Sequence, residues 1–415
     1  MGFIKNGAIY LSSTIVSKAI PFLLLPILTK YLSPEEYGLL ALFQVFIAFG
    51  LPFIGMNSHS VISRNFFKRD KEYNATLIFN LIIVITLTAL ITFLILSSFL
   101  VLFKQNISGI PNRWVMSIPL LVFFNMINNY CLTVLRNSKQ AFQFGFFEIS
   151  RTTLNLSISI ILVVFYSYNW FGRLYGIYLA SIIMGIFSII KLYNLGYLSI
   201  KFDRKQIKEI LLISIPLIPH VLGGVLINMS DRLFIQKMCS SLDLGVYSVG
   251  YQFGMIMSVL VLAVSKVFSP WIYENLLNEN MKNKIVKSTY LIMFSYLVLA
   301  FIISVLSSFL LPIMTPIEYH SGIDYIIWIT FGFAFFGMYN LMFPYGVHVG
   351  STKHLGIITF SIAILNMILN YLLIKLNGPI GAAQSTFFSF LLMFIFSFIY
   401  ANKLYPMPWL KILKK

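Results

Sequence analysis

The chain has 415 residues, of which 59% are hydrophobic and only 10% carry a charged side chain. A soluble domain is about 45–50% apolar, and one membrane span needs about 20 apolar residues. The composition therefore excludes a soluble enzyme with a single membrane anchor and predicts about twelve spans joined by short loops. The net charge of +17 is attributed to basic cytoplasmic loops, so no nucleic-acid partner is expected.

Apolar runs in chain order predict an all-α polytopic membrane protein with twelve transmembrane helices. Hydrocarbon cannot satisfy open backbone hydrogen-bonding groups, so each run is expected to be helical. The expected spans are residues 7–29, 38–62, 75–102, 114–135, 147–167, 172–193, 210–235, 244–272, 286–310, 323–347, 355–375 and 379–402. With the N-terminus inside, the cytoplasmic side holds roughly three times as many Lys and Arg residues as the other side, which predicts that both termini are cytoplasmic.

An internal repeat divides the chain into halves. The segment LTKYLSPEEYG at 28–38 resembles IQKMCSSLDLG at 235–245, and the offset of 207 residues is half the chain length. The repeat predicts two six-helix lobes, residues 1–194 and 210–415, related by a pseudo-two-fold axis along the membrane normal. A basic cytoplasmic linker, residues 195–209, joins them. The alternative interpretation is a coincidence between two short turns.

Prolines interrupt the first helix of both halves. Pro21 and Pro26 lie in the first span, and Pro216 and Pro219 lie in the seventh. Proline removes a backbone donor and bends a helix, and matched interruptions in two halves indicate a transporter's hinge or binding site. The alternative is that these are ordinary prolines, which are common in membrane helices.

No motif indicates catalysis, and neither a catalytic site nor a metal site is expected. The sequence has no P-loop, and its five histidines show no metal-ligand spacing. The functional argument therefore depends on ionisable groups inside spans, which are costly in lipid and usually face a cavity. Lys18, Lys266 and His59 are such groups, and cations in a low-dielectric cavity attract phosphate. For Lys266 and His59 the alternative is snorkelling to the membrane surface.

Four further residues are candidates. Arg151 follows Glu148 by one helical turn, so it either lines a cavity or forms a surface pair. Asp231 and Arg232 lie near the outer end of span 7. They either pair with each other or with another helix, anchor the membrane interface, or bind substrate and a coupling ion. His220 follows Pro219 and is a candidate proton carrier, because imidazole titrates near neutrality. Asparagines in several spans suit sugar hydroxyls, although amides also hold helices together.

The opening of the chain resembles a known family. Asn6, Ser13 and Lys18, followed by PFLLLPILTKYLSPEEYG at 21–38, resemble the start of the O-antigen flippases, the Wzx family of the multidrug/oligosaccharidyl-lipid/polysaccharide exporter superfamily. The resemblance implies alternating-access translocation of an undecaprenyl-pyrophosphate-linked oligosaccharide, of O-antigen or a related polysaccharide, across the bacterial inner membrane. Lys18 matches a basic position of the family's first helix.

The resemblance also implies partners and competing functions. The expected partners are the lipid-linked oligosaccharide, the membrane, and a polymerase and chain-length regulator of the same pathway. No cofactor is expected beyond a coupling proton or sodium ion. One alternative is a cation-coupled drug antiporter of the same superfamily, which would need cavity acids. The other is a membrane polysaccharide polymerase, which would need a large outer loop.

Overall fold

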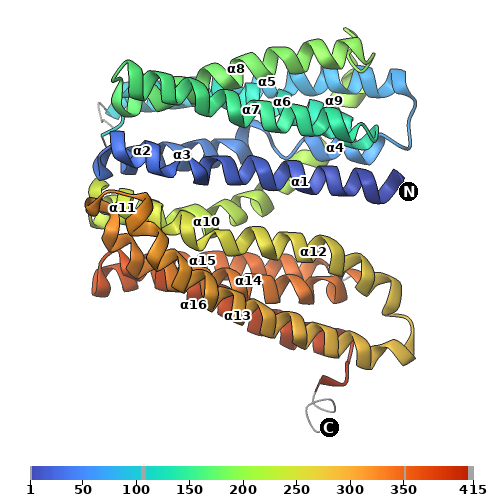
Figure 1. Ribbon diagram of the computed structural model, residues 1–415. Coiled ribbons are helices and arrows are strands. Elements are labelled where there is room, and N and C mark those ends of the chain that lie inside the picture. Colours follow the sequence, from blue (N-terminus) through green and yellow to red (C-terminus); the bar gives the residue numbers. More distant parts are fainter. Residues whose placement is uncertain (1, 104–108, 350–351, 410–415) are drawn as a thin grey trace. The chain divides into compact units, whose positions relative to one another are not determined.

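The computed structural model describes residues 2–103, 109–349 and 352–409, and this part of the chain is helical and contains no strand (Figure 1). Eleven of its helices are long and apolar enough to cross a membrane, and a bent helix pair brings the number to twelve. The protein is therefore a multi-pass membrane protein, and the prediction of an all-α polytopic fold is confirmed.

The chain divides into two compact units, Met1–Val225 (unit 1) and Leu226–Lys415 (unit 2). The helices that begin in unit 1 are α1 (Gly2–Leu23), α2 (Leu25–Tyr31), α3 (Pro34–Ile54), α4 (His59–Asn65), α5 (Lys71–Phe103), α6 (Asn112–Asn137), α7 (Ala141–Ile160), the π-helical turn η1 (Ile161–Phe165), α8 (Asn169–Asn194), α9 (Arg204–Ser214), the 3₁₀ turn η2 (Ile215–Leu217) and α10 (Ile218–Met238). Those of unit 2 are α11 (Ser241–Gly254), α12 (Ile256–Asn275), η3 (Glu279–Met281), α13 (Lys282–Met314), η4 (Ile317–Gly322), α14 (Ile323–His348), α15 (Thr352–Asn377) and α16 (Ile380–Leu404).

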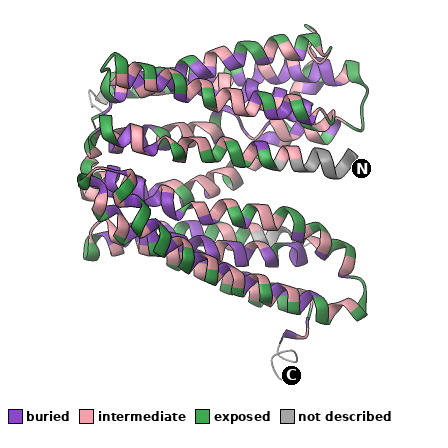
Figure 2. Cartoon of the chain, viewed as in Figure 1, coloured by how far each residue is buried: buried purple, intermediate pink, exposed green. Residues whose placement is uncertain are grey.

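The boundary between the units falls inside α10, and α9 belongs to unit 1. The last six residues of the segment expected to be a linker, 204–209, thus belong to a helix. The three-part division into residues 1–194, 195–209 and 210–415 stays a prediction. Buried and exposed residues alternate along the helices (Figure 2), as expected for helices with one side against their neighbours.

The two copies of the repeat form the same local structure. Ser33 caps α3 by accepting a hydrogen bond from the backbone N–H of Glu36 at 3.3 Å. Ser240 caps α11 by accepting from the backbone N–H of Asp243 at 3.0 Å. Each cap satisfies a donor that has no partner within its helix, so the repeat marks the start of a helix in both halves.

The expected span 38–62 is two helices rather than one. Helix α3 ends at Ile54 and α4 begins at His59, and between them Met56 and Asn57 have φ values of 47° and 52°. Non-glycine residues rarely adopt this left-handed conformation, which cannot continue a right-handed helix. The chain therefore turns here, and the residues that follow the break, Asn57, Ser58, His59 and Ser60, are polar.

The four prolines lie at or beside helix breaks. A break at Leu24 separates α1, which contains Pro21, from α2, which contains Pro26. Pro216 lies in η2, and Pro219 lies between the segments Arg204–Leu217 and Val221–Met238, which are bent by 44° relative to each other. These breaks are consistent with the missing proline N–H. Whether they act as hinges remains a prediction.

Candidate functional site

Glycines on α8 allow this helix to approach α7 closely. A Cβ atom at Gly176 would lie 2.8 Å from the backbone nitrogen of Ser159, and one at Gly172 would lie 3.0 Å from the carbonyl carbon of Leu162. These separations are too short for a side chain. Small residues one turn apart are a common means of bringing membrane helices together. The contact places α8 side chains beside the polar residues of α7.

Arg173 lies between these glycines in sequence and reaches across to α7. Its guanidinium donates hydrogen bonds to the side-chain oxygen of Asn155 and, at 2.8 Å, to the hydroxyl of Ser159. Both acceptors are neutral. The positive charge is thus held in place by hydrogen bonds without being neutralised by them.

Arg173 and Arg151 line the same cavity of about 400 Å³ within unit 1. The cavity is formed by α1, α3, α6, α7 and α8, and Ser181 on α8 donates a 3.3 Å hydrogen bond to Asn125 on α6. Its polar lining residues are Ser17, Asn125, Asn129, Arg151, Thr152, Asn155, Arg173 and Ser181, and its apolar ones are Pro21, Ile47, Leu51, Leu156, Ile177 and Ala180.

The cavity is cationic. Its described lining residues include two arginines and no carboxylate, and neither arginine belongs to the two ion pairs found in the described part of the chain. Glu148, one turn before Arg151, instead accepts a 3.2 Å hydrogen bond from Thr14 on α1. Two guanidiniums among amides and hydroxyls can bind an anionic group that also carries hydroxyls.

The structure brings only some of the predicted unit 1 residues to this cavity. Arg151 and Pro21 line it. Lys18 is exposed on α1 and is not among the lining residues, although its neighbour Ser17 is. His59 lies at the start of α4, and its Nδ1 is buried without a hydrogen-bond partner among the described residues.

His59 lies outside the helices that could cross the membrane. Burial of the imidazole and, secondarily, the positive charge of Arg136 lower the pKa of His59 below its ordinary value of 6.5. At neutral pH the ring is therefore uncharged, and it presents a hydrogen-bonding group rather than a cation.

The lowered pKa predicts acid sensitivity that depends on His59. Below pH 6.5 the His59 imidazole is protonated in the unfolded chain but stays neutral in the folded protein. The free energy of unfolding therefore falls as the pH drops toward the pKa of the folded state, by at most about 1.4 kcal/mol per pH unit. We expect His59→Gln to flatten this part of the profile. The measurement is the thermal unfolding midpoint of purified protein from neutral to mildly acidic pH. An identical slope in wild type and variant would contradict the assignment.

In unit 2, Asp231 and Arg232 form a buried cluster. Their side chains pair at 2.9 Å, and each residue is less than 10% exposed. The Tyr247 hydroxyl donates a 2.5 Å hydrogen bond to the second oxygen of Asp231, and the Arg232 guanidinium lies 4.3 Å from the ring centre of Tyr251. Of the interpretations left open by the sequence, the structure shows the two residues paired with each other.

The other candidates of the second half lie apart from this cluster. Lys266 is exposed on α12. The side chain of His220 lies outside the described residues. Asn366 and Asn370 are fully buried and bind Ser230, Ser385 and Ser389 within unit 2, so they hold helices together.

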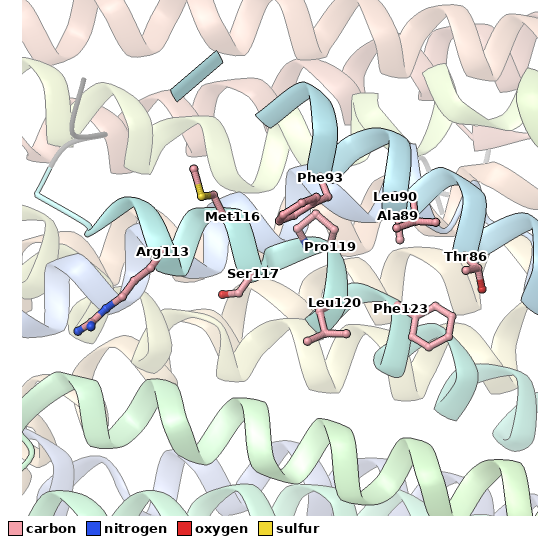
Figure 3. A pocket seen from close by; sticks show the side chains of 10 residues that line it. All are labelled: Thr86, Ala89, Leu90, Phe93, Arg113, Met116, Ser117, Pro119, Leu120 and Phe123. Atoms are coloured by element: carbon pink, nitrogen blue, oxygen red, sulfur yellow. The ribbon is translucent and has the colours of Figure 1, made fainter. Parts of the chain in front are cut away.

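A second hollow lies between α5 and α6. It has a volume of about 430 Å³ and is lined mainly by apolar side chains, with Arg113 at one end and Thr86 and Phe123 toward the other (Figure 3). This hollow has a single charged residue, Arg113, at its edge, whereas two arginines, Arg151 and Arg173, line the first cavity. The cavity lined by Arg151 and Arg173 is therefore the candidate functional site.

Sequence reasoning missed Arg173. Arg173 lies at the outer end of a predicted span, shortly after Trp170, where interfacial residues gather. The signal in the sequence was its position beside Gly172 and Gly176, because small residues one turn apart indicate the side of a helix that packs closely against a neighbour. Ser181, two turns further along the helix, is a polar residue that also lines the cavity.

Comparison with known proteins identifies the family. Residues 3–276 match the family described as "Polysaccharide biosynthesis protein". The chain belongs to this family. A membrane protein of Haemophilus influenzae, named only as uncharacterized, is 26% identical over an alignment of 297 residues, and the match covers 68% of each chain.

Solved structures show that this family member has the fold of the exporter superfamily. A multidrug resistance MATE family transporter of the MOP superfamily, inward-facing, has a TM-score of 0.73 at 14% identity and covers 95% of both chains. The lipid II flippase MurJ, in an inward closed conformation, also has a TM-score of 0.73, at 16% identity over 96% of this chain and 87% of its own. The expected resemblance to the exporter superfamily is therefore confirmed at the level of the fold.

Proposed function

We propose that this protein is a flippase that moves an undecaprenyl-pyrophosphate-linked oligosaccharide from the cytoplasmic to the periplasmic leaflet by alternating access. The observation that carries the proposal is the cavity with Arg151 and Arg173 and no lining carboxylate among the described residues. Membership of a polysaccharide biosynthesis family and a fold similar to that of a lipid II flippase support it.

The cavity offers a separate group for each part of such a substrate. The guanidiniums of Arg151 and Arg173 bind the pyrophosphate, because charge-assisted hydrogen bonds to phosphate oxygens are strong and geometrically suited to arginine. Asn125, Asn129 and Ser181 offer amides and a hydroxyl to the sugars. The polyprenyl tail stays in the bilayer, which already solvates it.

The remaining candidates belong to the same proposal. Lys18 and Lys266 supply cations on other parts of the substrate's route, and His59 supplies a hydrogen bond. Arg232 joins them only in a state in which its ion pair with Asp231 is open. Asp231 and His220 are the candidates for proton or sodium coupling. Both termini are proposed to lie in the cytoplasm of a bacterial cell, with the protein in the inner membrane.

The same observations argue against the alternatives. A drug antiporter that exports cations needs a carboxylate in its cavity, whereas the described lining of this cavity carries two positive charges. A polymerase needs catalytic groups, and we propose that this chain is a transporter without enzymatic activity. The polymerase and chain-length regulator of the pathway are proposed as separate proteins that use its product.

Deletion of the gene tests the proposal. We expect single undecaprenyl-linked repeat units to accumulate on the cytoplasmic leaflet, where added periplasmic enzymes cannot reach them, and wild-type protein to restore their export. Unpolymerised units displayed on the periplasmic side would instead identify a polymerase. Unchanged lipid-linked intermediates with altered drug resistance would identify an antiporter.

A further inference from the structure

Helix α9 is fixed to unit 1 by one side. Gln206, Ile210 and Ser214 are buried on that side. The Gln206 side chain accepts a 3.0 Å hydrogen bond from Asn80, and Glu209 accepts one of 2.7 Å from the Tyr73 hydroxyl. These bonds tie α9 to α5, so its opposite side has a definite orientation.

The opposite side of α9 carries cations at its start and apolar residues further along. Arg204, Lys205 and Lys208 are exposed, and none is in an ion pair within the described part of the chain. Leu212 is 66% exposed, and Ile215, the first residue of the following turn η2, is 52% exposed. Residues 204, 208, 212 and 215 share one helical stripe, which is about 16 Å long at 1.5 Å per residue.

The order of these groups suits one leaflet of a bilayer, in which the headgroups lie outside the hydrocarbon. Helix α9 is the first part of a bent helix pair that is apolar enough to cross the membrane. The preceding Phe202 is 65% exposed beside Lys201. A soluble anion would use the cations but would leave the apolar residues in water, whereas a phospholipid covers both.

We propose that the outer side of α9 is a binding site for an anionic phospholipid of the bilayer. The headgroup phosphate binds Arg204, Lys205 and Lys208, and an acyl chain lies along Leu212 and Ile215. This site is separate from the cavity of Arg151 and Arg173, and the inference does not depend on the proposed transport function.

The test measures lipid binding by the purified full-length protein in detergent, using native mass spectrometry. The probes are a short-chain phosphatidylglycerol and a phosphatidylcholine with the same acyl chains. We expect wild type to prefer phosphatidylglycerol. The variant Arg204→Gln/Lys205→Gln/Lys208→Gln should bind it at least about tenfold more weakly at low salt, because each surface cation contributes about fivefold and salt screens part of the effect.

A matched control removes the same charge elsewhere. Lys284, Lys287 and Lys403 are exposed in unit 2, and changing all three to Gln should leave the preference intact. The single variant Lys208→Gln should give an intermediate loss, which guards against misfolding of the triple variant. Equal weakening by the control, or none by the α9 variants, would overturn the proposal.

A second variant separates a lipid site from a simple anion site. Leu212→Ser/Ile215→Ser keeps every cation and should weaken binding of both lipids. If this variant binds normally, or if inorganic phosphate displaces phosphatidylglycerol as well as excess lipid does, the cations form only an ion site and the lipid assignment is wrong.

Discussion

Replacing Arg173 with glutamine should weaken binding of a polyprenyl pyrophosphate by roughly 10- to 150-fold. A hydrogen bond to a charged group contributes about 1.5–3 kcal/mol, and glutamine keeps a polar amide but carries no charge. Arg151→Gln should have a similar effect, and the double variant should lose measurable binding. The measurement is titration calorimetry with a short-chain polyprenyl pyrophosphate, alongside surface polysaccharide in complemented deletion cells.

Two controls make the result specific. Arg113→Gln removes the same charge from an exposed site at the edge of the α5–α6 groove and should leave binding unchanged. Arg173→Lys retains the charge but loses the planar fork and should keep part of the affinity. Normal affinity in Arg151→Gln/Arg173→Gln, with the protein folded, would remove the cavity from the proposed mechanism.

Replacing Asp231 with asparagine should destabilise the protein by about 3–5 kcal/mol. Breaking a buried ion pair leaves the other charge without compensation, and the Arg232 side chain is only 10% exposed. The Tyr247 hydroxyl would also lose its charged acceptor. The measurement is the unfolding midpoint of purified protein in detergent, followed by intrinsic fluorescence.

The double variant Asp231→Asn/Arg232→Gln should recover much of this loss, because it removes the unpaired charge. Lys282→Gln serves as the matched control. It breaks a pair of 2.7 Å with Glu279, but Glu279 is exposed and such pairs contribute little, so no clear shift is expected. If Asp231→Asn is as mild as this control, the ion pair is not needed for stability, and Asp231 is free to change its charge state as the proposed coupling residue.

The general architecture was predictable because the lipid bilayer, which is the solvent of the spans, determines it. The bilayer requires long apolar helices, so composition alone predicts their number, and helix caps are local, so Ser33 and Ser240 could be matched from sequence. The break after α3 was missed, because the apolar runs on either side of it were joined into one span. Met56 and Asn57 adopt left-handed conformations, and the turn-forming residues Gly55, Asn57 and Ser58 are the local signal for this turn.

The candidate site was predictable only in part. Arg151 and the asparagines could be recognised as polar residues inside spans. Arg173 could not be placed, because its position depends on how closely α7 and α8 approach, and that distance is set by tertiary contacts at Gly172 and Gly176. Conversely, Lys18 fitted the pattern of a buried cation, yet it is exposed on α1.

The neutral hydrogen-bond partners of Arg173 have a consequence for the step of the proposed transport cycle in which no substrate is bound. A carrier must return empty, and a cationic site without its anion would then be left with an unsatisfied charge. Asn155 and Ser159 satisfy the guanidinium in that state, and because they are uncharged they yield to a pyrophosphate. A carboxylate in their place would compete with the cargo for the arginine, so these two residues favour both loading and the unloaded return.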